Sequence, residues 1–306
     1  MLKSLLKPEY LFQPRFLFKR LFSSKVADQD VFADFRLPWG LPIRVRPSEE
    51  HGRMLFTLGV IDLVVSEFLW RLCEPGETQI DVGGNIGYMT SILGIRTQLR
   101  DGGRVIVFEA NPEVFEELVF NVNRWQQVIP CLDIDPLNLA ASSFSGSMKL
   151  EMPDGYESNR GLSRIASLES TGPIVDINSQ TLDNVIGNES VGVLKLDVEG
   201  HELEVLDGAR ELFSGGRVRD CIFEEHNEYP TPVTDFFENH GYTVMRLHRS
   251  ILGPRLLCAD SSVNRVAWHP TNFLATLDYG RVKKLVYPRG WKVLQKSHLP
   301  LANNIT

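Results

Sequence analysis

Two patterns of apolar and polar positions alternate from residue 78 onward, and their alternation predicts the fold. Short, continuous apolar runs have the length and composition of strands that are buried on both faces. These runs are 78–82, 104–108, 193–197 and 221–224, with a later strand at 242–247. Segments with a helical period separate them at 86–99, from Asn111-Pro112 onward, at 200–213 and at 233–240. We therefore predict a doubly wound α/β fold with a mostly parallel sheet and an antiparallel late strand.

The same pattern divides the chain into three regions. Residues 1–50 are a basic N-terminal arm followed by a short hairpin, and residues 51–250 are the α/β domain. Residues 251–306 are a C-terminal extension whose role the pattern does not indicate. Within these regions we expect a hairpin at 34–46, a helix at 59–72 and strand fragments at 265–268 and 273–276.

The N-terminal arm differs from the rest of the chain in its charge. Its first 25 residues carry six basic side chains and one acidic side chain, and so a net charge of +5, with phenylalanines interleaved. Such an arm is suited to peripheral contact with an anionic membrane surface or with a partner protein. The alternative, which we favour, is that the arm folds onto its own domain.

The overall composition limits the class of protein. Apolar residues make up 43% of the 306 residues, which is typical of a globular chain with a substantial core. The net charge of −7 argues against a nucleic-acid partner. The four cysteines include no CxxC pair, which favours free thiols and a cytoplasmic location.

The clearest local motif is a glycine-rich turn at residues 81–87, Asp-Val-Gly-Gly-Asn-Ile-Gly, between a predicted strand and a predicted helix. Glycines allow a tight turn and let a ligand approach the backbone without meeting a Cβ atom. Glu109 follows Gly87 by 22 residues, at the end of the next strand. An acid about 20 residues after such a turn is expected to accept hydrogen bonds from the ribose of an adenosine cofactor.

The order of the glycines favours one adenosine cofactor over another. A nicotinamide dinucleotide site requires Gly-x-Gly-x-x-Gly, because the pyrophosphate needs bare backbone at the second glycine. Asn85 stands at that position. S-adenosylmethionine has no phosphate, and its sulfonium and amino-acid groups suit polar neighbours such as Asp81 and Asn85. The motif therefore favours S-adenosylmethionine, with a dinucleotide-dependent oxidoreductase as the alternative.

A second group of ionisable residues follows the strand at 193–197. Lys195, Asp197 and Glu199 alternate along its end, and His201 begins the next helix. Several ionisable groups at one strand end are costly to bury unless they have a role. In a parallel sheet they would face the same crevice as the glycine turn.

Four runs of sequence resemble the FkbM-type methyltransferases: DVGGNIGYMT, VFEANP, NLAAS at 138–142 and, most specifically, LKLDVEGHELEVLDGA at 194–209. CIFEEHN at 221–227 also fits, and the resemblance covers about residues 55–248. It implies that residues 51–250 are a class I, Rossmann-like methyltransferase domain. It further implies that S-adenosylmethionine is the donor and that a hydroxyl group on a small molecule or a glycan is the acceptor.

The resemblance also assigns roles to individual residues. It implies a cofactor site made of Asp81, Gly83, Asn85, Gly87, Glu109, Asn138 and Ala140. In that site Glu109 would hold the ribose, and Asn138 and Ala140 would lie near the adenine or the methionine end. Asp197 and Glu199 would lie closest to the reacting centre.

Methyl transfer to a hydroxyl needs a base within hydrogen-bonding reach of its proton. The candidates for catalysis are Asp197, Glu199, Lys195 and His226, with His201 as a further base. Asp197, Glu199 and His226 have the chemistry to hold a cation, but their spacing does not require one, and we predict no metal. Each residue also has a structural interpretation: Asp197 as a turn cap, Glu199 as a helix-start acid and Lys195 as an ion-pair partner.

Two other functions remain open at this point. A non-catalytic module would bind the adenosine ligand and regulate a partner, although the ionisable residues at 195–202 count against it. A methyltransferase that acts on an amine is also compatible with the acidic character of 197–202.

Overall fold

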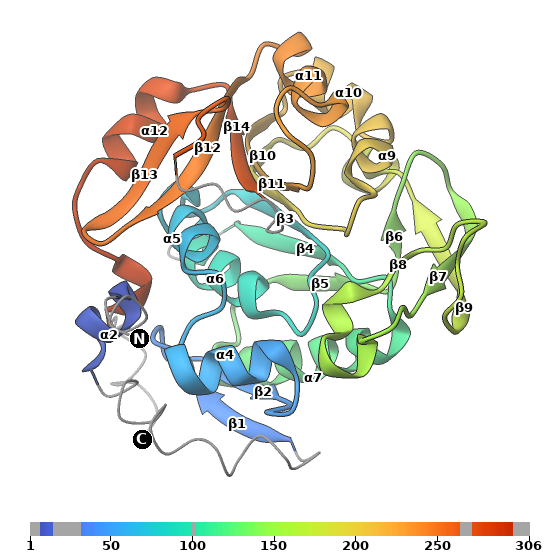
Figure 1. The fold of residues 1–306 in the computed structure, drawn as a ribbon, viewed down its shortest axis with the longest axis horizontal. Helices are drawn as coiled ribbons and strands as arrows, with labels where there is room; N and C mark the ends of the chain where they lie inside the picture. The colour runs from blue at the N-terminus through green and yellow to red at the C-terminus, as the bar shows by residue number, and fades with distance from the viewer. Residues whose placement is uncertain (1–6, 15–31, 99–101, 264–270, 296–306) are drawn as a thin grey trace.

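The computed structural model describes residues 7–14, 32–98, 102–263 and 271–295. Within them, one sheet has eight strands in the order β13-β12-β14-β11-β10-β3-β4-β5 (Figure 1). The strands are β3 (Thr78–Val82), β4 (Arg104–Phe108), β5 (Ile134–Leu137), β10 (Val191–Leu196), β11 (Val218–Glu225), β12 (Thr243–Ser250), β13 (Gly253–Cys258) and β14 (Thr271–Thr276). The five strands from β5 to β11 are parallel. β14 is antiparallel to both of its neighbours, and β13 is antiparallel to β12.

This strand order confirms the predicted doubly wound fold. The chain runs outward from β3 to β4 and β5, and later returns to the centre at β10 before it runs outward to β11. β3 and β10 are therefore neighbours from which the chain departs in opposite directions. The carboxyl ends of two such strands border a crevice, because their following connections lie on opposite faces of the sheet.

Helices cover both faces of the sheet, and the strand residues alternate between two cores. Val105 and Val107 pack against helices on one face, and Ile106 and Phe108 against helices on the other. The first face is covered by α5 (Leu63–Leu72), α6 (Tyr88–Thr97), α7 (Pro112–Val128) and α12 (Tyr279–Val286). The second is covered by α8 (Leu182–Ile186), α9 (Glu202–Asp207), α10 (Arg210–Ser214) and α11 (Pro232–Asn239). The central strands β3, β4 and β10 are thus buried on both faces, as their continuous apolar runs predict.

Two predicted helices differ from those in the structure. The helix expected at 59–72 begins only at Leu63, as α5, and Gly59, with a left-handed φ of 73°, ends the preceding helix α4 (Glu50–Leu58). Asp62 then caps α5 by accepting hydrogen bonds from the backbone amides of Val64 and Val65. The helix expected at 200–213 is divided into α9 and α10 at Gly208, where an added Cβ would lie 2.0 Å from the Ser142 carbonyl oxygen.

A smaller sheet stands beside the main one, in the green part of the chain (Figure 1). Its strand order is β6-β9-β7-β8. The strands are β6 (Ala140–Ala141), β7 (Gly146–Glu151), β8 (Arg164–Ile165) and β9 (Ile174–Gln180). Between β7 and β8 the chain forms two short 3-10 helices, η2 (Tyr156–Ser158) and η3 (Arg160–Leu162). This insertion brings residues 152–165 next to the carboxyl ends of the central strands.

The hairpin and the described part of the N-terminal arm pack against the α/β domain. The predicted hairpin is present as β1 (Ala33–Arg36) and β2 (Pro42–Val45). In the described part of the N-terminal arm, α2 (Pro8–Phe12) places Glu9 in an ion pair with Arg249 at 2.5 Å. Most of the basic residues of the arm lie outside the described residues, so its contact with a membrane or a partner stays a prediction. No helix in the described ranges is long and apolar enough to cross a membrane.

The main sheet extends beyond residue 250, where the sequence analysis ends the domain. β14 contains the predicted fragment 273–276 and lies between β11 and β12, so the C-terminal extension completes the core. The pattern alone did not indicate this, because the described residues between β13 and β14, 259–263, contain no helix that would mark β14 as part of the α/β alternation. The fragment expected at 265–268 lies outside the described residues.

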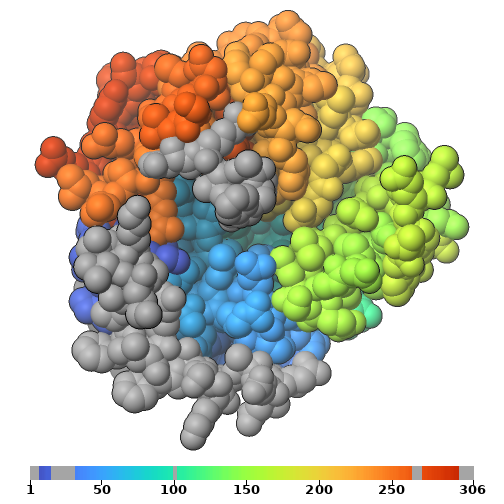
Figure 2. Space-filling model, in the orientation of Figure 1, coloured from blue at the N-terminus to red at the C-terminus, as the bar shows by residue number. Residues whose placement is uncertain are grey.

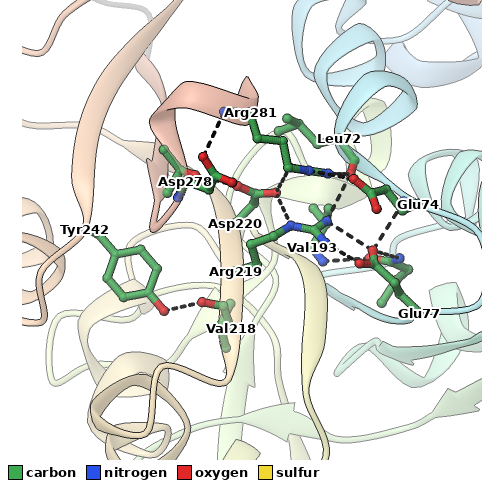
Figure 3. A network of polar contacts seen from close by, with 12 residues as sticks. Leu72, Glu74, Glu77, Val193, Val218, Arg219, Asp220, Tyr242, Asp278 and Arg281 are labelled. Carbon is green, nitrogen blue, oxygen red and sulfur yellow. Dashed lines mark hydrogen bonds and ion pairs between the residues drawn. The ribbon is translucent and has the colours of Figure 1, made fainter. Parts of the chain in front are cut away.

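An ionic network joins the start of β11 and the residue before β3 to the carboxyl end of β14 (Figure 3). Asp220 is fully buried and accepts hydrogen bonds from Arg219 at 3.0 Å, Arg281 at 2.8 Å and Thr276 at 2.7 Å. Arg219 also pairs with Glu77, which precedes β3, and Arg281 lies in the first turn of α12. Through Asp220, the network ties β11 and β14 to the C-terminal helix.

Replacing Asp220 by alanine is expected to lower the free energy of unfolding by about 3–5 kcal/mol, because it leaves two half-buried guanidinium groups without the buried carboxylate that they share. The measurement is urea denaturation followed by circular dichroism. Asp207→Ala is the control, because Asp207 forms a largely exposed ion pair with Arg210 that is worth less than about 1 kcal/mol. Equal losses in the two variants would contradict this interpretation of the network.

Candidate functional site

The carboxyl ends of β3, β4, β10 and β11 border a cavity of about 530 Å³. Its other walls are α4 and the residues of η3 and β8. Figure 2 shows the molecule hollowed between α4, drawn in blue, and the green segment that includes η2 and η3. The cavity therefore lies at the crevice that the strand order predicts.

The glycine-rich turn is held against the neighbouring strands. The amides of Gly83 and Gly84 both donate to the Phe108 carbonyl, at 3.0 and 2.9 Å. An added Cβ at Gly83 would lie 1.9 Å from the Asp197 carbonyl oxygen, and one at Gly84 would lie 2.2 Å from a methyl group of Val107. Glycine is therefore required here by the close packing of β3 between β4 and β10.

Of the residues predicted for the cofactor turn, two line the cavity and two lie behind it. Gly83 and Asn85 are part of the cavity wall. Gly87 packs toward Trp125 of α7, where an added Cβ would lie 2.7 Å from the ring. Asp81 is fully buried below the turn and accepts a hydrogen bond from Thr90 at 2.7 Å.

Glu109 lies at the end of β4 on the cavity wall. The two oxygens of its carboxylate accept hydrogen bonds from the backbone amides of Asn85 and Asn111, both at 2.8 Å. Burial raises the pKa of Glu109 to about 7, against the lowering effect of these hydrogen bonds. Each oxygen has one further acceptor position, so the carboxylate is fixed in orientation and still able to bind a ligand.

The residues predicted near the adenine or the methionine end are separated by the structure. Ala140 lines the cavity. The side chain of Asn138 instead donates to the carbonyls of Glu109, at 2.9 Å, and Ala110, at 3.3 Å. Asn138 therefore holds the backbone that carries Glu109.

Lys195 connects the turn with the end of β10. Its ammonium group donates to the Gly83 carbonyl at 2.9 Å and lies 3.2 Å from Asp81 and 3.4 Å from Asp197. Burial alone would lower the pKa of Lys195, but the carboxylates of Asp81 and Asp197 hold it above its ordinary value. Lys195 is therefore a cation that positions Asp197, whose side chain is 42% exposed.

Three further ionisable residues meet at the edge of the cavity. Glu199, Glu224 and His226 each place one potential ligand atom within 4.8 Å of the others. Burial and the nearby Asp197 raise the pKa of Glu199 to about 7, and burial together with Asp197 and Glu199 raises that of Glu224 to about 9. Glu199 also has a left-handed backbone, with φ of 53°. Such a conformation is unusual for a residue other than glycine and is frequent at functional sites.

Two residues that line this cavity, Glu224 and His51, were not predicted from the sequence as site residues. Glu224 lies within the run CIFEEHN, one residue before the end of β11, and its position near a strand end close to His226 was the available signal. His51 comes from α4, far from the motifs in sequence, and contacts the side chain of Asn85 on the cavity wall. Burial lowers the pKa of His51, so its imidazole is neutral at pH 7.

His201 also lines the cavity, but both of its ring nitrogens are engaged. Nε2 lies 2.9 Å from the Ser142 hydroxyl, and Nδ1 lies 3.6 Å from the carboxylate of Glu204. These contacts join α9 to β6 across the edge of the cavity. They favour a positioning role for His201 over that of a base.

Comparison with known proteins gives one family match. Residues 81–244 match the family model described as the methyltransferase FkbM domain. The match covers more than half of the chain and includes the glycine turn, Glu109, the end of β10 and the end of β11.

Two curated relatives are similar to this chain. The hexuronic acid methyltransferase AglP of Haloferax volcanii is 30% identical over 172 residues, which are 54% of this chain and 62% of that protein. The 31-O-demethyl-FK506 methyltransferase FkbM of Streptomyces tacrolimicus is 27% identical over 198 residues, which are 56% of this chain and 75% of that protein. The chain thus matches about three fifths of the first relative.

Solved structures with a related arrangement include the methyltransferase FkbM of Methylobacillus flagellatus. It is 17% identical with a TM-score of 0.43, and the match covers 66% of this chain and 43% of that one. An S-adenosylmethionine-dependent O-methyltransferase from Thermotoga maritima is 16% identical with a TM-score of 0.40, covering 71% of this chain and 65% of that one.

Proposed function

This chain belongs to the FkbM family, and we propose that it is an S-adenosylmethionine-dependent methyltransferase that methylates a hydroxyl group of a sugar or another small molecule. The relatives support this choice of acceptor, since one is named for a hexuronic acid and the other for the O-demethyl form of FK506. The observation that carries the proposal is the cavity in which Glu109 and the glycine turn face the ionisable residues of β10 and β11.

The residues of the cavity fit S-adenosylmethionine. The carboxylate of Glu109 is fixed by two backbone amides and has acceptor positions left for the two ribose hydroxyls. The backbone at Gly83 and Gly84 carries no side chain that would block the approach of the ligand. Asp197 is held by Lys195 and offers a carboxylate to the positively charged amino group of the methionine part. When bound, S-adenosylmethionine supplies an electrophilic methyl group on its sulfonium.

The base for the acceptor hydroxyl would be His51. It is neutral at pH 7, it lines the cavity, and its electrostatic neighbours include Asp197, which stabilises the imidazolium form. The other candidate histidines are less suited: His201 is engaged at both nitrogens, and His226 is exposed beside Glu224. Alignment of the hydroxyl by the surrounding walls would supply a large part of the rate enhancement.

Glu109→Gln is expected to weaken the binding of S-adenosylhomocysteine at pH 8 by about 10-fold or more, since it removes the charge that accepts the ribose hydroxyls. Calorimetric titration measures this effect. Glu116→Gln is the control, because Glu116 is an exposed acid on α7. Unchanged affinity in Glu109→Gln would remove the main support for the cofactor site.

The same carboxylate predicts a pH dependence. The pKa of Glu109 is raised to about 7, so the carboxylate becomes protonated as the pH falls from 8 to 6. Affinity for S-adenosylhomocysteine should then fall by about 10-fold for each pH unit below 7, and Glu109→Gln should show a weaker dependence. The pKa of Glu199 is raised to a similar value. The difference between the pH profiles of the wild type and of Glu109→Gln therefore gives the part of the pH dependence that is due to Glu109.

His51→Gln is expected to lower kcat by about 100-fold or more, while the affinity for S-adenosylhomocysteine stays unchanged. Acceptors to screen are hexuronic acids, neutral sugars and hydroxylated macrolides, with formation of S-adenosylhomocysteine as the signal. Amino sugars and simple amines test the amine alternative. A His51→Gln variant with wild-type kcat on the best acceptor would exclude His51 as the base.

A further inference from the structure

A second cavity lies beside the first one. It has a volume of about 590 Å³ and is lined by residues of the loop after β7, the start of α9, the end of β11 and the start of α11. Leu162, Arg164, Glu199 and His226 line both cavities. Glu199 and His226, two members of the ionisable group at the edge of the first cavity, therefore stand at the junction between the two spaces.

Within the described ranges, the two carboxylates at this junction have no lysine or arginine paired with them. These carboxylates are those of Glu199 and Glu224, and His226 lies 3.8 Å from Glu224. The nearby basic side chains have other partners: Lys195 pairs with Asp81 and Asp197, and Arg164 pairs with Glu151 at 3.0 Å. Two half-buried carboxylates close together repel each other unless one of them is protonated or a cation lies between them.

The ligand types and their positions match those of a metal site. Two carboxylate oxygens and one imidazole nitrogen lie within 4.8 Å of one another, close enough to share one ion. Glu224 and His226 follow from the end of β11, and Glu199 follows β10, so the rigid sheet holds the three residues in place. Carboxylates suit Mg²⁺ and Mn²⁺, while imidazole suits the transition metals, so Mn²⁺ is compatible with the whole set.

We propose that Glu199, Glu224 and His226 bind one divalent cation at the junction of the two cavities, where it holds the oxygen atoms of the methyl acceptor. Three protein ligands leave coordination positions open for oxygens of a sugar or a similar hydroxylated molecule. The second cavity would then hold the part of the acceptor that is not methylated. The binding of the ion is independent of the proposed function, whereas its role toward the acceptor rests on that function.

The ion is tested directly by electron paramagnetic resonance of Mn²⁺ titrated into the purified full-length protein. The free ion gives a six-line signal that is lost on binding, so the titration yields stoichiometry and affinity without any acceptor. We expect one bound Mn²⁺ for each chain and competition by Mg²⁺. Glu224→Gln and His226→Asn should each weaken Mn²⁺ binding by about 10-fold or more. Because His226 is exposed, its replacement tests the site even if Glu224→Gln destabilises the fold.

Glu116→Gln is the matched control, since it removes one acidic charge at a distance from the junction and should leave Mn²⁺ binding unchanged. Absence of Mn²⁺ binding at millimolar concentration, or equal binding in Glu116→Gln and in the two ligand variants, would overturn the proposal. Calorimetry with S-adenosylhomocysteine on the same samples separates this failure from that of the proposed function. Nucleoside binding without Mn²⁺ binding refutes the metal site alone, and Mn²⁺ binding without nucleoside binding refutes the proposed function alone.

Discussion

Replacing Gly83 by alanine is expected to raise the dissociation constant for S-adenosylhomocysteine by more than about 100-fold and to lower the free energy of unfolding by about 3 kcal/mol or more. Gly83 has φ of 79°, and an added Cβ would lie 1.9 Å from the carbonyl oxygen of Asp197. The left-handed backbone alone costs an alanine about 1–2 kcal/mol. To relieve the contact, β3 and β10 must separate at their carboxyl ends, and this displaces the cavity wall.

Gly102→Ala separates the two causes. Gly102 also has a left-handed backbone, with φ of 87°, but an added Cβ there meets nothing within 4 Å. Its alanine variant should lose only the backbone cost and should bind S-adenosylhomocysteine as the wild type does. Denaturation and calorimetry on both variants are the measurements. Similar losses in Gly83→Ala and Gly102→Ala would show that the close approach of the two strands is not what requires glycine.

The second large effect is expected at Arg71, whose replacement by methionine should lower the free energy of unfolding by about 4 kcal/mol or more. Arg71 and Glu67 lie on α5, their side chains are fully buried, and they form an ion pair at 2.6 Å. The guanidinium also donates to four carbonyls of the C-terminal segment, those of Leu285, Val286, Pro288 and Gly290. Methionine fills much of the space but leaves these carbonyls without the guanidinium, and it leaves the buried Glu67 carboxylate without its cation, with a backbone donor at Val293.

A double variant tests this explanation. In Arg71→Met with Glu67→Gln, the buried charge is removed together with its partner, so part of the loss should be recovered. Recovery should remain incomplete, because the four carbonyls still lack a donor. The free energies of unfolding of the two single variants and the double variant, measured by thermal and urea denaturation, form a double-mutant cycle with the wild type. A double variant that is less stable than Arg71→Met would contradict the view that the isolated carboxylate causes much of the loss.

The parts of the fold that the sequence predicted are those with a strong local signal. β3, β4 and β10 are buried on both faces, so their apolar runs are continuous and easily recognised. The glycine turn was predictable because contacts with the adjacent strands leave no room for a Cβ atom at Gly83 and Gly84. The resulting glycines form a motif that is visible in the sequence. Glu109 was found because the length of the intervening helix fixes its distance along the chain from the turn.

Residues that depend on long-range contacts could not be predicted in this way. His51 lies on α4, which Gly59 and Asp62 separate from α5. The boundary between the two helices falls at the start of the predicted helix 59–72, whose helical period gives no sign of it. Asn138 has the composition of a ligand-binding residue, but its amide is used to hold the backbone near Glu109. Its role depends on the pairing of β4 with β5, which no local pattern specifies.

The position of β14 has a consequence for the synthesis of this protein on the ribosome. In the finished sheet, β11 and β12 do not pair with each other, because both are hydrogen-bonded to β14. A nascent chain that has emerged only as far as residue 250 therefore has an open edge at β11, whose centre is the apolar run Cys221, Ile222 and Phe223. Open apolar strand edges promote aggregation. We therefore expect premature termination between β12 and β14 to yield insoluble chains, although such a chain would already contain every residue named for the cofactor and the cation.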